Sequence, residues 1–171
     1  MTEDFDLFDK DFENESKEQK EREKHQEKQY EKFKGLGVEG IQNINPVWAT
    51  GKFMDQNMMN RLEPNGSYAH IQVSTIGLIE EVDFGELNPK ILFSGDMASD
   101  MRFVTTLDRW EGGLPVDPPE LGIDINNGKI NFKVSDGRHR AILAFHLGED
   151  CIPVYVHKSN IEHIKILVKT C

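Results

Sequence analysis

Residues 135–140 carry the densest group of chemically active side chains in the sequence, Ser-Asp-Gly-Arg-His-Arg. They lie between an alternating segment, 129–134, and an apolar segment, 141–147, that is typical of a helix. The free N–H groups and the positive dipole end at a helix start favour an anion. Gly137 permits a positive φ or the close approach of a phosphate, and the basic side chains add cationic donors. The pattern therefore predicts a phosphate site at 135–140.

An ordinary capped helix is the alternative interpretation of these residues. Ser135 or Asp136 would then be the N-cap, and the three basic side chains after Gly137 would be solvated. The helix dipole disfavours basic residues in a first turn, and this favours the anion site over the capped helix.

Phosphoryl transfer at such a site needs a clamp of positive charge, usually with a metal ion. His139 and Arg140 would supply part of that clamp. The histidines after the turn match no metal-ligand spacing, so we expect no metal site made by the protein alone. Spacing does not select among the carboxylates that could serve as a base or touch a metal: Glu80, Glu81, Asp83, Asp96 and Asp100.

The elements that would position the turn follow from periodicity and turn residues. Asn127-Gly128 between alternating segments predicts a hairpin that joins 123–125 to 129–134. We expect strands within 71–82, with Gly77 as a break, and a buried strand over 151–156. The expected helices cover 51–62, 100–110 (capped by Ser99 and ended by Gly112), 141–147 and 161–168.

The segment 134–156 resembles the ParB N-terminal/sulfiredoxin-like superfamily. The likeness is carried by the run Ser-Asp-Gly-Arg-His-Arg-Ala-Ile-Leu-Ala, then Gly148, then Ile-Pro-Val at 152–154. The preceding order of helix, Gly, Leu-Pro-Val and hairpin over 99–134 is similar too. The resemblance implies an α+β domain with a small mixed sheet and flanking helices. It also implies a turn that holds the phosphates of ATP, ADP or CTP, and the chemistry of phosphoryl transfer adds Mg²⁺ as the expected accompanying ion.

The resemblance also implies roles for individual residues. Gly137, His139 and Arg140 match phosphate-binding positions of sulfiredoxins, and Asp136 matches the Asp in the Asp-Gly-His-His-Arg turn of free-serine kinases. Taken with the residues of the turn itself, the nucleotide-binding candidates are Ser135, Gly137, Arg138, His139 and Arg140, and the catalytic candidates are His139 and Asp136.

Two departures from the family pattern limit the function. Arg138 stands where sulfiredoxins carry their nucleophilic Cys, which argues against sulfinic-acid reduction. A helix-turn-helix domain does not follow the turn before residue 171, which argues against the centromere binding of ParB partition proteins.

Composition excludes several classes of function. The 171 residues hold 20 Lys+Arg and 30 Asp+Glu, a net charge of −10, which argues against a general duplex-DNA ligand. No apolar run is long enough for a membrane helix, and the acidic N-terminus is unlike a secretory signal, so we expect a cytoplasmic protein. Cys151 and Cys171 form no Cys-x-x-Cys pair, so we expect neither a zinc knuckle nor a disulfide framework.

The chain divides into a charged extension, 1–37, that is helical or disordered, and a folded domain, 38–171. Phe5, Phe8 and Phe12 lie at i, i+3 and i+7 among aspartates and would share one face of a helix. They form either a docking motif for a protein partner or a face that packs on the chain's own domain, and both interpretations stay open.

The leading functional hypothesis is a nucleotide-binding protein that performs phosphoryl transfer or nucleotide hydrolysis. One alternative is a non-catalytic acidic interaction protein that docks a partner through its extension. Another is a nuclease or an ADP-ribosylating toxin of the same fold, and the acidic charge counts against the nuclease.

Overall fold

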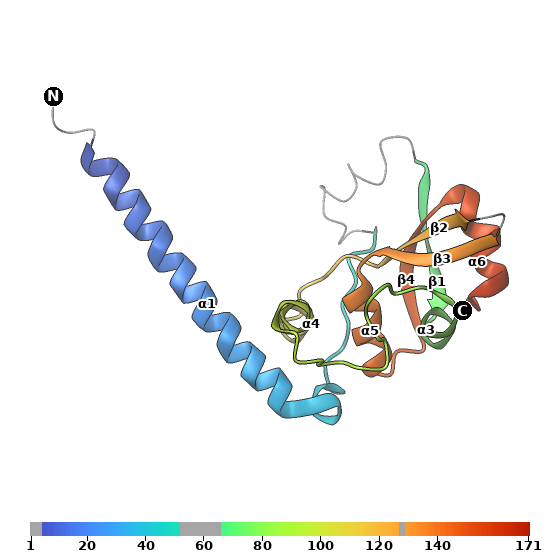
Figure 1. The fold of residues 1–171 in the computed structure, drawn as a ribbon, viewed down its shortest axis with the longest axis horizontal. Helices are drawn as coiled ribbons and strands as arrows, with labels where there is room; N and C mark the ends of the chain where they lie inside the picture. The colour runs from blue at the N-terminus through green and yellow to red at the C-terminus, as the bar shows by residue number, and fades with distance from the viewer. Residues whose placement is uncertain (1–4, 52–65, 127–128) are drawn as a thin grey trace.

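The computed structural model describes residues 5–51, 66–126 and 129–171. Its strands form one sheet in the order β1-β4-β2-β3: β1 is Tyr68–Ser74, β2 Glu120–Asn126, β3 Lys129–Asp136 and β4 Cys151–His157. β1 pairs with β4 and β2 with β3 antiparallel, whereas β2 and β4 are parallel. The expected α+β fold with a small mixed sheet and flanking helices is confirmed (Figure 1).

The described residues also form five α-helices (Figure 1): α1 Phe5–Ile41, α3 Thr75–Glu81, α4 Met97–Glu111, α5 Arg138–His146 and α6 Ile161–Leu167. The expected hairpin is present, with Ile123 opposite Phe132. The strand expected over 151–156 and the helix expected over 161–168 are also present. Except for Gly51, the helix expected over 51–62 lies outside the described residues.

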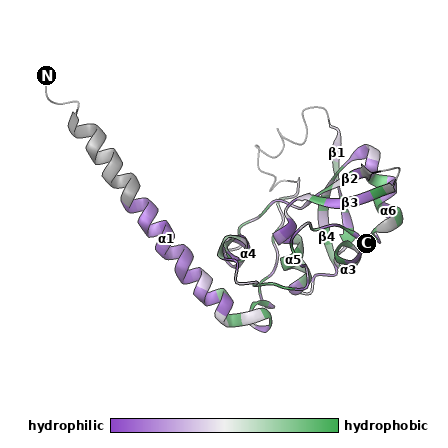
Figure 2. Cartoon of the chain, in the orientation of Figure 1, coloured by the Kyte–Doolittle hydropathy of each residue, from purple (hydrophilic) through white to green (hydrophobic). Residues whose placement is uncertain are grey.

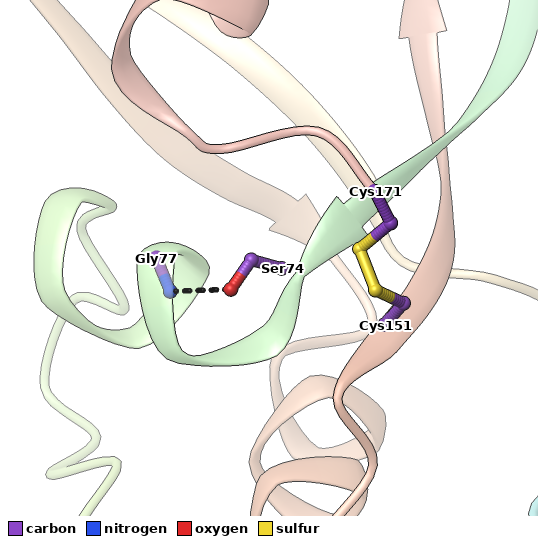
Figure 3. Close-up of a disulfide and its surroundings, with 4 residues drawn as sticks. All are labelled: Ser74, Gly77, Cys151 and Cys171. Atoms are coloured by element: carbon purple, nitrogen blue, oxygen red, sulfur yellow. Dashed lines mark hydrogen bonds between the residues drawn. A yellow bond between two sulfur atoms is a disulfide. The ribbon is translucent and has the colours of Figure 1, made fainter.

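The prediction of strands within 71–82 is wrong after Ser74. Residues 75–81 form α3, because Ser74 caps the helix: its Oγ accepts a hydrogen bond from the Gly77 N–H at 3.3 Å (Figure 3). A short apolar run fits a buried strand as well as a helix, and the cap decides between them here.

Helix α4 begins three residues earlier than predicted. Asp96, not Ser99, is its N-cap, with Oδ1 accepting from the Ala98 N–H at 3.3 Å. Gly112 ends the helix as expected. Ser99 therefore lies in the first turn, where its hydroxyl is not needed to cap the helix.

The last part of the segment 1–37 packs into the core. Helix α1 passes the expected stop at 35–37 with a kink at Gly37 (φ 62°) and reaches Ile41. Tyr30, Phe33 and Ile41 are buried, with Phe33 fully inaccessible. Figure 2 shows the long polar rod of α1 giving way to apolar residues near this kink.

Helix α1 is held against α4 by polar pairs as well as by this core. Lys32 is ion-paired with Glu111, and His25 Nε2 lies 3.2 Å from Asp108 Oδ2. Polar contacts with α4 are therefore made at His25 and Lys32, and the N-terminal part of α1 extends away from the domain (Figure 1).

Cys151 and Cys171 form a disulfide, so the expectation of none is wrong (Figure 3). Folding brings their Cα atoms to 6.3 Å, because the C-terminal segment runs beside β1. The Ser74 N–H donates to the Lys169 carbonyl at 2.7 Å and Thr170 bridges to Val73.

Among the described residues, no helix has the length and apolar character to cross a membrane.

Candidate functional site

The turn before α5 is built on Gly137. Strand β3 continues to Asp136, and Gly137 adopts φ 79° as the helix N-cap, with no side-chain cap bond. The alternative in which Ser135 or Asp136 caps the helix is therefore wrong. Ser135 instead lies against β2, since a Cβ on Gly122 would come within 2.5 Å of its Oγ. The structure does not bring Ser135 to the helix start.

Arg140 folds back across the turn rather than extending into solvent. Its Nη2 donates to Asp136 Oδ2 at 2.9 Å and its Nη1 to the Asp117 carbonyl at 2.6 Å. Its side chain is only 16% exposed. A Cβ on Gly137 would lie 2.9 Å from the Arg140 Nε and from the Pro119 Cα. Gly137 is thus required to make room for the guanidinium, and Asp136 holds that group in place.

Arg138 is held by the loop that follows α3. Its Nη1 donates to the Phe84 carbonyl at 3.1 Å. Gly85 leaves the space for this group, since a Cβ there would come within 2.6 Å of Nη1. A carbonyl partner orients the guanidinium without cancelling its charge. The capped-helix alternative, in which Arg138 and Arg140 are simply solvated, does not describe either side chain.

His139 joins α5 to α4. Its Nε2 lies 2.9 Å from Ser99 Oγ, and its ring packs edge-on against Phe103 with centroids 4.8 Å apart. Burial first, and then the charges of Arg102, Arg138 and Arg140, lower the pKa of His139 to about 4, against a smaller opposing effect of Asp100. At neutral pH the imidazole is uncharged, so it is a hydrogen-bonding group here and not a cation.

A cleft of about 300 Å³ adjoins the Ser99–His139 contact. Its wall contains the apolar side chains of Leu87, Ile91, Phe103 and Ile142, which come from the loop before α4, from α4 and from α5. The polar lining residues are Glu86, Asn88, Ser94, Asp96 and Ser99. The site thus combines a cationic turn with a partly apolar cleft.

Asp100 is a structural anchor at the rim of this cleft. It is fully buried and accepts hydrogen bonds from the Ser94 and Gly95 N–H groups, each at 3.0 Å. The Tyr30 hydroxyl of α1 donates to it at 3.4 Å. A carboxylate with these partners is not free to ligate a metal or to act as a base.

Over the described residues, no group of three or more His, Cys, Asp or Glu side chains could hold a metal ion. Mg²⁺ is commonly held by nucleotide phosphates together with one or two carboxylates. Glu86 and Asp96 line the cleft and fit that smaller requirement, although Asp96 also caps α4.

A larger cleft of about 500 Å³ lies between α1 and α4, lined by residues that include Arg22, His25, Gln29, Val104 and Asp108. Its lining includes none of the turn residues 135–140 and none of the arginines whose charges act on His139. We therefore place the candidate site at the smaller cleft, which adjoins the Ser99–His139 contact and the basic turn.

Ser99 is the site residue that sequence reasoning missed, because it was assigned to capping. It lies 40 residues from His139 in the chain, so no local sequence pattern predicts their contact. Ser99 lies three residues after Asp96, and its place in the first turn of α4 could have been recognised only if Asp96 had been identified as the cap.

Comparisons with known proteins give one distant likeness. No protein-family model matches the chain, and no curated protein matches it. Among solved structures, the chain is similar to the Oncogenic Suppression Activity Protein, a plasmid fertility inhibition factor studied as a gold(I) cyanide derivative. The TM-score is 0.48 and the identity 14%, over 63% of this chain and 60% of that protein. The chain thus spans less than two thirds of the length of this structural neighbour.

Proposed function

We propose that this protein binds a nucleotide, with its phosphates at the start of α5 and its base and sugar in the adjoining cleft. The observation that carries the proposal is the gathering of Arg102, Arg138 and Arg140 about an uncharged His139, in a chain whose net charge is −10. A concentrated positive potential in an acidic protein is typical of a site for a small anion.

The backbone at the turn supports the same proposal. The first intrahelical bond of α5 runs from the Ala141 N–H to the Gly137 carbonyl at 3.0 Å. The N–H groups of residues 138–140 precede it and point out of the helix start. Because Gly137 supplies no side-chain cap, these donors can serve a phosphate oxygen.

The charged and neutral side chains of the turn would have different roles in binding the nucleotide. Arg138 and Arg140 are oriented in advance by protein carbonyls, so little side-chain freedom is lost when an anion binds. Asp136 would position Arg140, and His139 would contribute a neutral hydrogen bond. The apolar wall of Leu87, Phe103 and Ile142 suits a flat ring, and about 300 Å³ is at the lower end of ligand cavities. Phosphoryl transfer or hydrolysis is the chemistry that we propose for the bound nucleotide.

Calorimetric titration tests the binding. ATP, ADP, CTP, GTP and NAD are each titrated with and without magnesium. Arg140→Ala should weaken the best ligand about 10- to 150-fold, the range for a lost hydrogen bond to a charged group. Arg109→Ala is the matched control, since Arg109 also donates to a carbonyl, that of Pro115 at 2.8 Å, but away from the turn. If wild type binds no nucleotide at millimolar concentration, the proposal fails.

A second candidate is an interaction protein, because the outer part of α1 extends from the domain (Figure 1) and residues 17–28 are all exposed. Phe5, Phe8 and Phe12 would dock a protein partner on this helix. Replacing all three by Ala should abolish capture of a partner while nucleotide affinity stays unchanged. Loss of both would point to one integrated function.

A further inference from the structure

We propose that Ser99 is the phosphoryl acceptor of this site, so that the protein phosphorylates itself on Ser99 from a bound nucleoside triphosphate. This inference rests on the proposed nucleotide site and goes beyond it by naming the acceptor.

The position of the hydroxyl carries the argument. Ser99 lines the cleft, is half-buried and lies in the first turn of α4. Its Oγ is 2.9 Å from His139 Nε2, so the tautomer of His139 that is protonated at Nδ1 accepts a hydrogen bond from the hydroxyl and orients its oxygen. Through His139 the hydroxyl adjoins the turn where the phosphates would lie.

The surroundings hold this pair in place. Phe103 packs against the His139 ring and fixes its orientation. On the other side, Asp100 follows Ser99 and is pinned by the Ser94 and Gly95 N–H groups. The first turn of α4 is thereby tied to the rim of the cleft, and Ser99 is presented from a rigid element.

The charges around the pair favour phosphoryl over acyl transfer. Acyl transfer by a Ser–His pair develops an imidazolium as the base takes the proton, and three neighbouring guanidiniums oppose that charge. The transition state of phosphoryl transfer is loose and spreads negative charge over three oxygens, so it gains from the guanidiniums and needs little help from a base.

The step is balanced as follows. The bond between Ser99 Oγ and the terminal phosphorus forms as the bond from that phosphorus to the bridging oxygen breaks. A nucleoside diphosphate leaves with the electron pair of the broken bond. The serine proton passes to an oxygen of the transferred phosphoryl group and from there to solvent, while His139 stays neutral and only orients the hydroxyl.

The simplest competing role for Ser99 is to orient His139 without reacting. A second Ser–His pair in the chain separates the two roles. Ser159 Oγ lies 2.7 Å from His157 Nδ1 at the exposed end of β4, outside the residues of the candidate site. Ser159→Ala is therefore a matched control for the removal of a histidine-bonded hydroxyl.

The test incubates the full chain with nucleoside triphosphate labelled at the terminal phosphate, plus magnesium, and locates the label by peptide mapping. We expect one labelled site, Ser99, background labelling in Ser99→Ala, and wild-type labelling in Ser159→Ala. Label mapped to another residue overturns the inference even if Ser99→Ala folds poorly. If wild type binds nucleotide by calorimetry yet gains no label, the acceptor is wrong and the nucleotide site stands. If wild type binds no nucleotide, both fail.

Discussion

Ser99 Oγ and His139 Nε2 lie 2.9 Å apart and join the first turns of two helices, α4 and α5. The contact brings the positive ends of two helix dipoles together, beside three arginines and next to the cleft that Ser99 lines. The chemistry of the site therefore depends on how α4 packs on α5, as much as on the basic turn itself.

The uncharged state of His139 predicts a pH dependence of stability. Its folded pKa, about 4, is below the ordinary value of 6.5, so between these pH values the unfolded chain binds a proton that the folded chain does not. Stability is fully present above pH 6.5 and falls as the pH drops toward 4. Urea unfolding across this window should show a shallower loss for His139→Gln than for wild type.

His146, whose pKa burial also lowers, is present in both proteins and cancels in that comparison. Equal slopes for wild type and His139→Gln would contradict the environment that we describe. A bound phosphate should raise the pKa of His139, because its charge offsets the arginines, and NMR titration of the imidazole with and without nucleotide measures this shift.

Gly137→Ala should destabilise the protein through two effects. The residue has φ 79°, and its new Cβ would lie 2.9 Å from Arg140 and Pro119. Gly148→Ala is the control, since Gly148 has φ 81° with nothing within 4 Å of its Cβ position. Gly148→Ala should cost about 1 kcal/mol from the backbone alone, and Gly137→Ala at least about 1 kcal/mol more from crowding. Equal losses in chemical denaturation would show that Arg140 moves aside freely.

Removal of the disulfide should lower stability substantially. Cys151 and Cys171 are separated by 20 residues, and closing a loop of that size is worth about 3 kcal/mol. Reductant should lower the urea midpoint of wild type and leave that of Cys171→Ser unchanged. If reductant leaves the wild-type midpoint unchanged, the pair does not form in solution. Alkylation of free thiols in a fresh cell extract measures whether the bond is present in the cell. Free Cys151 and Cys171 thiols would agree with the expected cytoplasmic compartment, where disulfides are rare.

Phe33→Ala should be far more damaging than changes on the outer face of α1. Phe33 is fully buried in the core, and truncation of such a ring costs about 3–5 kcal/mol. Lys28→Ala, on an exposed position of the same helix, should change stability by less than about 0.5 kcal/mol. Deletion of 1–16 should be tolerated, whereas deletion of 1–34 should unfold the domain. A folded product lacking 1–34 would show that Phe33 is dispensable.

The sequence by itself determined the elements whose signals are local. The Asn-Gly hairpin, the end of α4 at Gly112 and the last strand follow from turn chemistry and periodicity within a few residues. The cationic turn at 137–140 was visible in the same way, as was the need for glycine at its first position.

Only the tertiary structure decided which distant residues meet. The helical state of 75–81 depended on a cap at Ser74, and the Cys151–Cys171 pair on the return of the C-terminal segment to β1. The burial of Phe33 and the contact of Ser99 with His139 required α1 and α5 to pack against α4. Propensities and caps act over one or two turns of chain, whereas these contacts are set by the burial of apolar surface across the whole domain.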